Sequence, residues 1–499
     1  MAYNSRSTMR NTATAATPRK QDALAAEYRE STDGEHKKAW GQFFTSPAVA
    51  SFMASLLPPP TRSDVRVLDP GAGTGVLGLA AAEALIASGA RVHLTAIEQE
   101  PGAVAALREA VAAAQARLGK RALTVDVIAG DFLELDQPRL GSAPLPRFDY
   151  VIANPPYFKM SPTDPHGGDA PNAYARFMEV GGRMLRPDGS LCFIIPRSFA
   201  AGFYFRRFRR RFHAAMRLDH VHLFESRRDA FRNDGVLQEN LIVLYRRTTD
   251  HVGPVRVSCS GGERDLDERF AHDVARERVI SSTDPNAVLY LPASERDIRV
   301  MDRFAAWKDT LATHGLDVST GPVVPFRAEE HLRTDRSRTT VPMLWLQHVL
   351  PGRVEWPLAK GFRKPEHIER DAPPKLLVPN HTYVLLRRFS AKEDARRLVA
   401  APYVANSLKG PMLGFENHVN FIHRKSGTFG DGEARALSAL LNSELVDAYF
   451  RISNGNTQVS ATELRLLPLP GRSELAALAA CLERGMDEEA AVIEVLGGV

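Results

Sequence analysis

Short hydrophobic runs alternate with Ala-rich helical patterns between residues 65 and 245. Continuous apolar runs such as Cys192–Ile195 are typical of strands that are covered on both faces of a sheet. Alternation of this kind predicts repeated βαβ units, and therefore an α/β, Rossmann-like fold with a mostly parallel seven-stranded sheet. The expected strands are Val65–Leu68, His93–Ile97, Thr124–Ile128, Phe148–Ala153, Leu191–Ile195, His220–Phe224 and Asn240–Tyr245.

The alternation ends near residue 250, and a less regular region rich in Pro, Arg and aromatic residues follows. This region is expected to form an α+β domain, which closes with one helical pattern of apolar residues from Ala434 to Ala448. The N-terminal stretch is polar and lacks periodicity, so disorder is expected there. The expected division is a disordered tail at 1–35, a catalytic domain at 36–250, a connector at 251–290, a target-recognition domain at 291–470 and a helical cap at 471–499.

Positive charge is modest in total but clustered. The formal net charge is +5 and the pI is about 9.1, which permits a nucleic-acid partner without requiring one. Each cluster is either a solvated surface or a phosphate-contacting one, because phosphate contact needs fixed positive charge along one face. The arginines concerned are five within Arg206–Arg211 and a looser group of Arg387, Arg388, Arg396 and Arg397.

Cysteine usage and hydropathy narrow the class of protein. The three cysteines are far apart and form no CxxC pair, which argues against a disulfide framework and against a structural zinc site. A reducing cytoplasm is therefore the expected location, and no metal is expected. The sequence has no apolar signal-peptide segment and no apolar stretch of roughly 18 residues, so we expect neither secretion nor a membrane partner.

A glycine-rich turn, Asp69–Gly75, follows the first expected strand. Gly71, Gly73 and Gly75 alternate there, which lets the backbone turn sharply and approach a ligand closely. The turn alone is a weak signal, because dinucleotide-binding enzymes share it. Asp69 at its start would repel a pyrophosphate and attract a cationic amino-acid cofactor, so the turn predicts a cofactor of the second kind.

Two further acidic residues end the next expected strands. Glu98 lies about 20 residues past the turn, where a carboxylate can accept hydrogen bonds from both hydroxyls of a ribose. Asp131 could accept from an adenine amino group, and Phe132 could stack on the adenine ring. Each acidic residue alone is more often a helix cap. Three of them after successive parallel strands predict a ligand site, because ligands bind along that sheet edge.

The fourth expected strand runs directly into Asn154, Pro155, Pro156 and Tyr157. Two successive prolines cannot continue a central strand, and they stiffen the turn while removing two backbone donors. The remaining carbonyl acceptors are therefore aimed rigidly at the same edge. An ordinary strand-ending turn is the alternative, but the position of the motif favours a catalytic role for all four residues.

An exocyclic amino group as the target explains these residue types. Its nitrogen is a poor nucleophile, because the lone pair is delocalised into the ring. The Asn154 side-chain oxygen and the Pro155 carbonyl can each accept one N–H, which localises that lone pair. Catalysis would then consist of orientation and electrostatic stabilisation, with no metal. Tyr157 offers a stacking face to a base outside the duplex, worth roughly 1–3 kcal/mol.

Together these residues resemble the amino-methyltransferases that place the cofactor motifs first and a target-recognition domain last. The chain is most similar to the adenine-specific N6 DNA methyltransferases of type II restriction-modification systems, in the BsuBI/PstI-like branch, over residues 36–470. The resemblance implies S-adenosylmethionine as the cofactor, double-stranded DNA as the partner and N6 of a flipped-out adenine as the target. It further implies protective modification alongside a cognate restriction endonuclease, which would share the DNA site without stable binding.

The resemblance also assigns roles to residues outside the central motifs. Gly41–Pro47 resembles the segment that closes over the methionine end of the cofactor, with Thr45 as the contact. Asp229–Phe231, followed by Val236–Asn240, resembles the segment that supplies a second aromatic face to the flipped base, which assigns stacking to Phe231. Softer matches in the C-terminal half lie at Ser319–Val324, Arg387–Lys392 and Gly455–Ser460.

Three other functions stay open from the residues alone. A protein methyltransferase that acts on a glutamine amide also uses an Asn-Pro-Pro-Tyr turn, but such enzymes lack a long basic C-terminal region. An RNA adenine methyltransferase poses the same chemistry in a smaller protein. A nucleic-acid-binding module without catalysis would not need the intact Asp69, Glu98 and Asn154 set. We favour DNA as the substrate and expect Arg387 and Arg388 to contact it.

Overall fold

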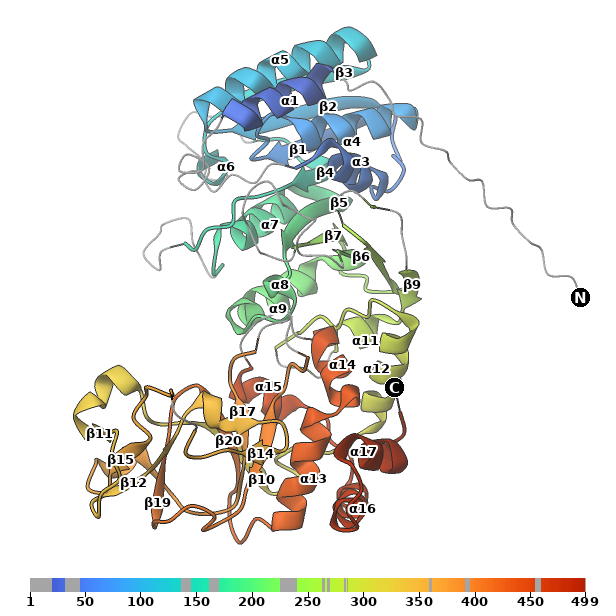
Figure 1. Ribbon diagram of the computed structural model, residues 1–499. Helices are drawn as coiled ribbons and strands as arrows, with labels where there is room; N and C mark the ends of the chain where they lie inside the picture. The colour runs from blue at the N-terminus through green and yellow to red at the C-terminus, as the bar shows by residue number, and fades with distance from the viewer. Residues whose placement is uncertain are drawn as a thin grey trace, which may run out of the picture. The chain divides into compact units, whose positions relative to one another are not determined.

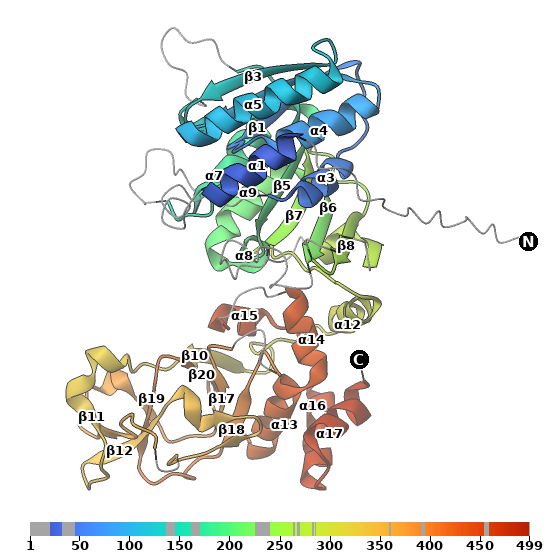
Figure 2. The ribbon, with the colours of Figure 1, turned by 45° about the horizontal axis from the view of Figure 1, so that its top comes forward.

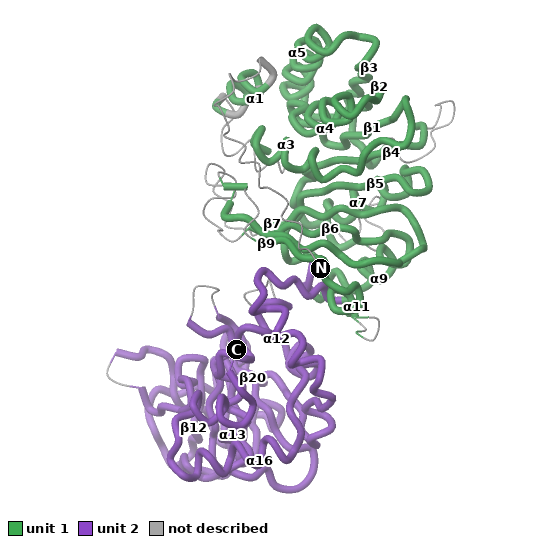
Figure 3. The backbone as a smooth tube through the Cα atoms, turned by 90° about the vertical axis from the view of Figure 1, so that its right-hand side faces the viewer, with its two compact units in different colours: residues 1–199, 203–287 green, residues 200–202, 288–499 purple. Residues whose placement is uncertain are grey.

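The structure is a computed structural model, and its described residues form two compact units, shown in different colours in Figure 3. Unit 1 comprises residues 1–199 and 203–287, and unit 2 comprises residues 200–202 and 288–499. Within the described ranges, no helix combines the length and apolar character that crossing a membrane requires. The described residues are 20–31, 45–135, 145–160, 170–224, 240–262, 265–266, 270–281, 284, 286–358, 361–390, 395–453 and 459–498.

Unit 1 is built on a nine-stranded sheet with the order β3-β2-β1-β4-β5-β7-β6-β8-β9 (Figure 1). Most neighbouring strands are parallel, whereas β7 runs antiparallel to both β5 and β6. The predicted α/β fold with a mostly parallel sheet is therefore confirmed. The strands are β1 (Asp64–Pro70), β2 (Arg91–Glu98), β3 (Leu123–Ala129), β4 (Phe148–Ala153), β5 (Leu185–Pro196), β6 (Arg217–Phe224), β7 (Asn240–Arg246), β8 (Val255–Ser260) and β9 (Phe270–Val274).

Helices cover both faces of this sheet (Figure 2), because its central strands are apolar on both sides. α3 (Pro47–Ser55), α4 (Val76–Ala87) and α5 (Pro101–Leu118) share one core with alternate residues of the strands. α7 (Ala173–Met184) packs on the opposite face, where Gly181 lies against Val151, Leu191 and Phe193. The other helices of unit 1 are α1 (Lys20–Ser31), α6 (Phe132–Leu135), η1 (Phe203–Phe205), α9 (Arg206–Ala215) and α11 (Arg276–Val279), and the division between the units falls within α8 (Ser198–Ala201).

The sheet extends beyond the seven expected strands, into the segment 251–290 that we expected to be a polar connector. β8 pairs in parallel with β6, and β9 pairs antiparallel with β8. Buried polar side chains obscure β8 in the sequence, because Ser258 and Ser260 interrupt its apolar pattern. Both serines hydrogen-bond to His222 of β6, at 2.8 and 3.0 Å, so their burial depends on a strand that is distant in sequence.

α1 lies within residues 1–35, which we expected to be disordered. In Figures 1 and 2 it lies beside α5, and the Tyr28 hydroxyl donates a 2.5 Å hydrogen bond to Glu100 Oε2. Glu100 also accepts from Ala103 N and so caps the start of α5. Periodicity does not reveal α1, because its sequence lacks a strong apolar face, and the helix is held by this tertiary contact.

Unit 2 has two main sheets, with the orders β10-β20-β17-β18 and β11-β15-β12-β19-β16, beside a group of helices. This composition confirms the α+β class predicted for the C-terminal half. The strands are β10 (Leu316–Thr320), β11 (Leu332–Arg333), β12 (Thr340–Leu344), β13 (Val349–Leu350), β14 (Arg353–Val354), β15 (His367–Glu369), β16 (Leu377–Pro379), β17 (Tyr383–Arg387), β18 (Ala400–Tyr403), β19 (Met412–Phe415) and β20 (Val419–Arg424). The helices are α12 (Glu295–Ala306), η2 (Pro325–Arg327), η3 (Glu329–His331), η4 (Leu346–His348), η5 (Pro374–Leu376), α13 (Asp431–Asn442), α14 (Glu444–Ser453), α15 (Ala461–Leu466), α16 (Arg472–Glu483) and α17 (Glu488–Leu496).

The apolar pattern from Ala434 to Ala448 forms two helices, α13 and α14, rather than the single helix predicted. Asn442 ends α13, because its side-chain amide donates to Ala400 O and accepts from Ala400 N. Ser443 follows in an extended conformation, and its hydroxyl accepts from Val446 N near the start of α14. The break therefore depends on a partner in β18 that periodicity cannot show.

Candidate active site

The strand order brings the predicted site residues to one edge of the unit 1 sheet. β3, β2, β1 and β4 are neighbours and run parallel, so their carboxyl ends lie side by side. Asp69 lies near the end of β1, Glu98 ends β2, and Asp131 and Asn154 follow β3 and β4. The structure thus places the cofactor and catalytic candidates along one line, where ligands of such sheets bind.

The glycine turn requires a backbone that other residues rarely adopt. Gly71, Gly73 and Gly75 all have positive φ, at 75°, 54° and 85°. A Cβ on Gly75 would also come within 2.6 Å of the Leu107 side chain of α5. Conformation and close packing therefore both require glycine here, and the turn leads into α4 as predicted for a ligand-cradling loop.

Asp69 is buried, with 1% of its surface exposed, and one of its carboxylate oxygens has no partner among the described residues. The other oxygen, Oδ2, accepts a 2.8 Å hydrogen bond from Gly78 N in α4. Burial raises the Asp69 pKa to about 7, and the nearby negative charge of Glu98 adds to the shift. A carboxylate in this situation is stabilised by a cation, so the predicted attraction for a cationic group has a structural basis.

Glu98 is buried and accepts three backbone hydrogen bonds. Gly73 N donates to Oε2 at 2.8 Å, while Gln99 N and Glu100 N each donate to Oε1 at 2.9 Å. The carboxylate therefore locks the glycine turn to the end of β2, a role that the sequence did not reveal. Two carboxylate oxygens have about four acceptor positions, so capacity for a ribose hydroxyl remains.

Asp131 and Phe132 lie where β3 passes into α6. Asp131 Oδ1 accepts from Leu133 N at 2.8 Å, which is the helix-capping interaction weighed against a ligand role in the sequence. The Phe132 ring is 2% exposed and packs on Phe177 of α7, with ring centroids 5.0 Å apart. The contacts of both residues with an adenine ring stay predictions.

The Asn154 side chain is held from both ends of its amide. Its Nδ2 donates to Thr45 Oγ1 at 3.0 Å, and its Oδ1 accepts from the Tyr157 hydroxyl at 2.8 Å. Pro155, which follows Asn154 in sequence, is buried. The contacts with the Thr45 and Tyr157 hydroxyls together hold the Asn154 amide in this orientation. The structure therefore brings together Thr45, assigned to the cofactor, and the catalytic candidates.

Tyr157 is half-buried, and its hydroxyl also lies 3.1 Å from Ile194 O of β5. Its ring meets the edge of the Tyr174 ring of α7, with centroids 6.0 Å apart. Burial raises the pKa of the Tyr157 hydroxyl well above its usual value, so this group stays protonated and can only act as a donor or neutral acceptor. Phe231, its predicted stacking partner, lies outside the described residues.

The arginines of α9 do not form the single phosphate-binding face considered from the sequence. Arg209 is fully buried and donates to three backbone carbonyls, those of Phe199, Asn286 and Ala287. Arg211 forms an ion pair with Glu179 at 3.0 Å. Helical spacing explains the division, because consecutive residues of a helix point to different sides.

The C-terminal arginines are likewise engaged by the protein. Arg387 Nε donates to Val349 O at 2.7 Å, and Arg388 Nη1 donates to Asn417 O at 3.0 Å. Arg397 is fully buried, with its side chain on Ser390 O, and Arg396 lies near two carboxylates of α14 and α17. Arg387 and Arg388 remain half-exposed, so their contact with DNA stays a prediction.

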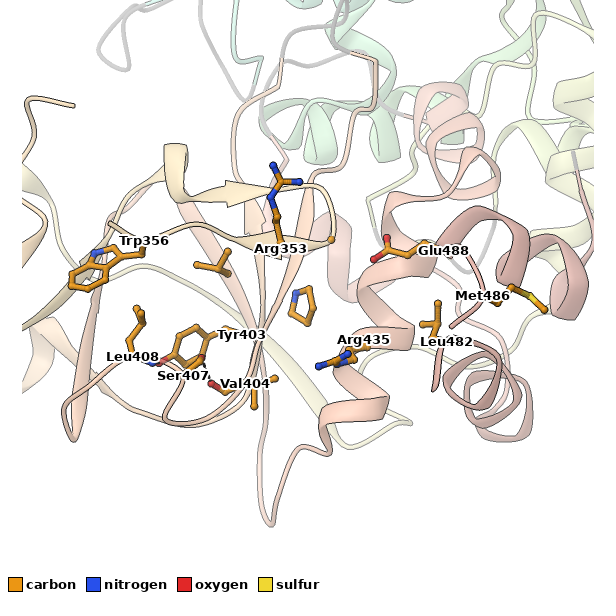
Figure 4. A pocket seen from close by; sticks show the side chains of 13 residues that line it. Arg353, Trp356, Tyr403, Val404, Ser407, Leu408, Arg435, Leu482, Met486 and Glu488 are labelled. Atoms are coloured by element: carbon orange, nitrogen blue, oxygen red, sulfur yellow. Dashed lines mark hydrogen bonds between the residues drawn. The ribbon is translucent and has the colours of Figure 1, made fainter. Parts of the chain in front are cut away.

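A cavity of about 590 Å³ lies in unit 2 (Figure 4). Arg353, Trp356, Tyr403, Arg435 and Glu488 are among the residues that line it. The charged residues of its lining are two arginines and one glutamate, so the lining carries a net charge of +1. None of the described residues that the sequence assigns to cofactor, catalysis or DNA lines this cavity.

Two families match parts of this chain. The N-6 DNA Methylase family matches residues 29–176, and the Eco57I restriction-modification methylase family matches residues 139–231. The first match includes the glycine turn, and both include Asn154–Tyr157.

Two relatives match nearly the whole chain. The type II methyltransferase M.BsuBI of Bacillus subtilis is 34% identical over 469 residues, which cover 89% of this chain and 90% of that protein. The type II methyltransferase M.PstI of Providencia stuartii is 30% identical over 486 residues, covering 95% and 96%. A tRNA1(Val) (adenine(37)-N6)-methyltransferase of Dickeya chrysanthemi is 30% identical over 172 residues, which cover 32% of this chain and 60% of that enzyme.

Among solved structures, the DrdV–DNA complex is similar over most of this chain. It has a TM-score of 0.50 at 13% sequence identity and covers 93% of this chain and 59% of that one. At this identity the likeness concerns the fold alone.

Proposed function

Because this chain belongs to the family of type II restriction-modification DNA methyltransferases, we propose that Asn154, Pro155, Pro156 and Tyr157 form its catalytic site. The chain is a DNA methyltransferase that transfers a methyl group from S-adenosylmethionine to N6 of adenine. The single observation that carries the proposed mechanism is the Asn154 amide, held between Thr45 and Tyr157 at the carboxyl edge of the sheet.

S-adenosylmethionine supplies a methyl group bonded to a positively charged sulfur. The residues along the sheet edge suit this cofactor, and Asp69 Oδ1, which has no partner among the described residues, is an acceptor suited to its ammonium group. We propose that Glu98 binds the ribose through a hydroxyl at its remaining acceptor position, rather than both hydroxyls as the sequence suggested. The other proposed contacts are Gly71, Gly73 and Gly75 with the amino-acid end, Asp131 and Phe132 with the adenine ring, and Thr45 with the methionine end.

The proposed role of Asn154 is to prepare N6 of adenine for attack on the methyl group. Its Oδ1 and the Pro155 carbonyl each accept one N6–H, which draws the nitrogen towards tetrahedral geometry and localises its lone pair. In the orientation that Thr45 and Tyr157 hold, the Asn154 nitrogen is engaged with Thr45, and Oδ1 keeps a lone pair for an N6–H. Catalysis then rests on acceptors fixed before the reaction, and these cost no reorganisation during it.

A target adenine must leave the duplex to reach this edge, and the proposed stacking face is Tyr157. Its hydroxyl is already engaged with Asn154 and Ile194, so the ring orientation is set before a base arrives. We propose that Phe231 supplies the second face. Unit 2 is the proposed target-recognition domain, with Arg387 and Arg388 as DNA contacts.

The biological role that we propose is protective modification in a restriction-modification system. A cognate endonuclease would recognise the same DNA site without stable binding to this chain. The alternative substrates are disfavoured by coverage, since the tRNA methyltransferase matches 32% of the chain whereas the type II relatives match about 90% or more.

Asn154→Ala tests the mechanism under single-turnover conditions with labelled S-adenosylmethionine and plasmid DNA. The methyl-transfer step should slow by about 100-fold or more, while cofactor and DNA affinity stay nearly unchanged, because the hydrogen bonds that Asn154 supplies strengthen in the transition state. A near-normal rate would overturn the mechanism, and methylation of cytosine would overturn the substrate.

Tyr157 variants separate capture of the base from chemistry. Tyr157→Ala removes the stacking face and should weaken the signal of a fluorescent base analogue at the target position. Tyr157→Phe keeps the ring but loses the bond to Asn154 Oδ1, so the methylation rate should fall by about tenfold at most. Equal loss of base capture in the two variants would exclude stacking as the role of the ring.

A further inference from the structure

Three segments of unit 2 that are far apart in sequence converge on the turn between β19 and β20. We define the recognition turn as Glu416–Asn420, which includes the first two residues of β20. From the segment after β10, Gly321 N donates to Val419 O at 2.7 Å, and Val323 O accepts from Asn417 N at 2.9 Å. The three segments belong to the Ser319–Val324, Arg387–Lys392 and Gly455–Ser460 segments that the sequence singled out, of which the structure describes residues 319–324, 387–390 and 459–460.

The second and third segments hold the other side of the recognition turn. Arg388 N donates to His418 O at 2.9 Å, and the Arg388 side chain donates to Asn417 O at 3.0 Å. Val459 N donates to Arg388 O at 2.8 Å, while Val459 O accepts from Asn420 Nδ2 at 3.0 Å. Every segment therefore bonds to the turn through backbone groups.

Gly321 shows how tightly the turn is held. A Cβ at this position would lie 2.1 Å from Glu416 O and 2.6 Å from Phe415 O. The backbone of the first segment thus lies directly on the backbone of the turn, with no room for a side chain. A loop with this support keeps its exposed side chains in a defined geometry, which base recognition requires.

The side chains of Phe389 and His418 reach solvent from the recognition turn and the segment that follows β17. Phe389 is 40% exposed, and the side chain of His418 is 42% exposed. Their rings meet edge to face with centroids 5.0 Å apart, and the Arg388 guanidinium lies 5.9 Å from the centre of the Phe389 ring. An aromatic face, an imidazole edge and a cation are therefore presented together.

A buried carboxylate determines how His418 is oriented. Glu416 is 1% exposed, and its Oε1 accepts a short hydrogen bond from His418 Nδ1. Because a carboxylate only accepts, this bond places the imidazole proton on Nδ1 and leaves Nε2 for another partner. The bond explains why a carboxylate is buried beneath an exposed histidine.

We propose that His418 of the recognition turn and Phe389, which packs against it from the segment after β17, read base edges of duplex DNA and determine part of the site specificity. The proposal rests on the proposed function of this chain as a DNA methyltransferase. Phe389 supplies an apolar contact and His418 Nε2 a hydrogen-bonding group, the two kinds of contact that distinguish base pairs in the major groove. Arg388 braces the turn beneath them and adds the positive charge that suits a polyanion.

The test starts from the unaltered protein on plasmid DNA, with its methylated adenines located by long-read sequencing. Binding is then measured with a 30-base-pair duplex that carries the DNA sequence found around these adenines. A duplex of equal length with a scrambled sequence serves as the comparison. Phe389→Ala and His418→Asn should each weaken binding to the site duplex by about 10- to 100-fold and to the scrambled duplex by less than about threefold. Methylation should also spread to sites that differ from the original at one base pair.

Matched variants separate base reading from support of the fold. His418→Asn retains an amide donor for Glu416 but lacks Nε2, and Phe389→Tyr retains the aromatic face and should keep the specificity. His381→Ala is the control, because His381 is an exposed histidine at the opposite end of β17 and should change neither affinity. Thermal unfolding of each variant identifies any that fails to fold. If His418→Asn does not fold, His418→Gln should still lower the ratio of the affinity for the site duplex to that for the scrambled duplex.

Equal losses on both duplexes, or an unchanged ratio in every folded Ala, Asn or Gln variant of the two residues, would overturn this proposal while leaving the methyltransferase assignment intact. Absence of methylated adenine on plasmid DNA with the unaltered protein would instead overturn the proposed function, and this proposal with it.

Discussion

At the scale of single residues, the raised pKa of Asp69 predicts that affinity for the cofactor depends on pH. Its pKa is raised to about 7 by burial, so the carboxyl is largely neutral at pH 6 and largely charged at pH 8. Because only the charged form pairs with the cofactor ammonium, affinity for S-adenosylmethionine should rise roughly tenfold between pH 6 and pH 7.5. Calorimetric titration at several pH values measures this slope, and Asp69→Asn should weaken binding and remove it.

Asp64→Asn is the matched control for this series. Asp64 lies at the other end of β1, is exposed and pairs with Arg91, so its substitution should leave the pH dependence of cofactor affinity in place.

The raised pKa of Asp69 also affects the stability of the protein without cofactor. A carboxyl whose folded pKa is raised loses its stabilising contribution as pH rises from the unfolded value through about 7. Asp69→Asn should therefore raise the melting temperature of the free protein more at pH 8 than at pH 5. If affinity for S-adenosylmethionine still rose between pH 6 and pH 7.5 in Asp69→Asn, the assignment of this pH dependence to Asp69 would be wrong.

A second prediction at this scale concerns Thr45, which has two assigned roles: it holds the Asn154 amide, and it contacts the cofactor. If Thr45 holds the Asn154 amide, Thr45→Val should lower kcat by about tenfold or more with little change in cofactor affinity. Thr45→Ser keeps the hydroxyl and should restore most of the rate. A loss of S-adenosylmethionine binding at unchanged kcat would instead support the cofactor contact that the sequence resemblance implies.

At the scale of elements, α9 is anchored by one buried side chain. Arg209→Met removes the donor for three carbonyls, which would be left unpaired in the interior, and should cost about 3 kcal/mol of unfolding free energy. Arg210→Met on the exposed side of the same helix should change stability by less than about 0.5 kcal/mol. Urea denaturation of the two variants measures both values, and equal midpoints would show that Arg209 does not anchor α9.

Elements differ in how far their own sequence identifies them. β4 and β5 are continuous apolar runs, so each was predicted from its residues alone. β8 was missed because Ser258 and Ser260 are buried polar residues, paired with His222 of β6. The break between α13 and α14 was missed for the same kind of reason, since Asn442 ends the helix by binding Ala400.

At the scale of the whole molecule, DNA binding and cofactor binding should be separable, because their predicted residues belong to different units. Replacing Arg387 and Arg388 with Ala should weaken duplex binding and reduce the slope of log affinity against log salt by about 0.9 for each DNA phosphate that the variant no longer neutralises. Affinity for S-adenosylmethionine should not change. Gel-shift titrations over a salt series measure the slope, with Arg353→Ala in the same unit as the comparison. Unaltered binding at every salt concentration would leave these arginines as structural donors to Val349 O and Asn417 O.

The sequence by itself determined the α/β class, the strands β1 to β7 and the positions of the predicted site along them. These features depend on local periodicity and on the rule that parallel strands end at one edge, so Asp69, Glu98 and Asn154 could be grouped without coordinates.

Only the tertiary structure decided which partners these residues have. Thr45 lies 109 positions from Asn154, and nothing in the spacing relates the hydroxyl to the amide. Glu98 likewise accepts from Gly73 N of the glycine turn, and Asp131 accepts from Leu133 N of its own turn. Residue type alone could not distinguish these bonds from ligand contacts. The five arginines in Arg206–Arg211 have one composition but several environments, because helix geometry and the packing of distant carbonyls divide them between interior and solvent.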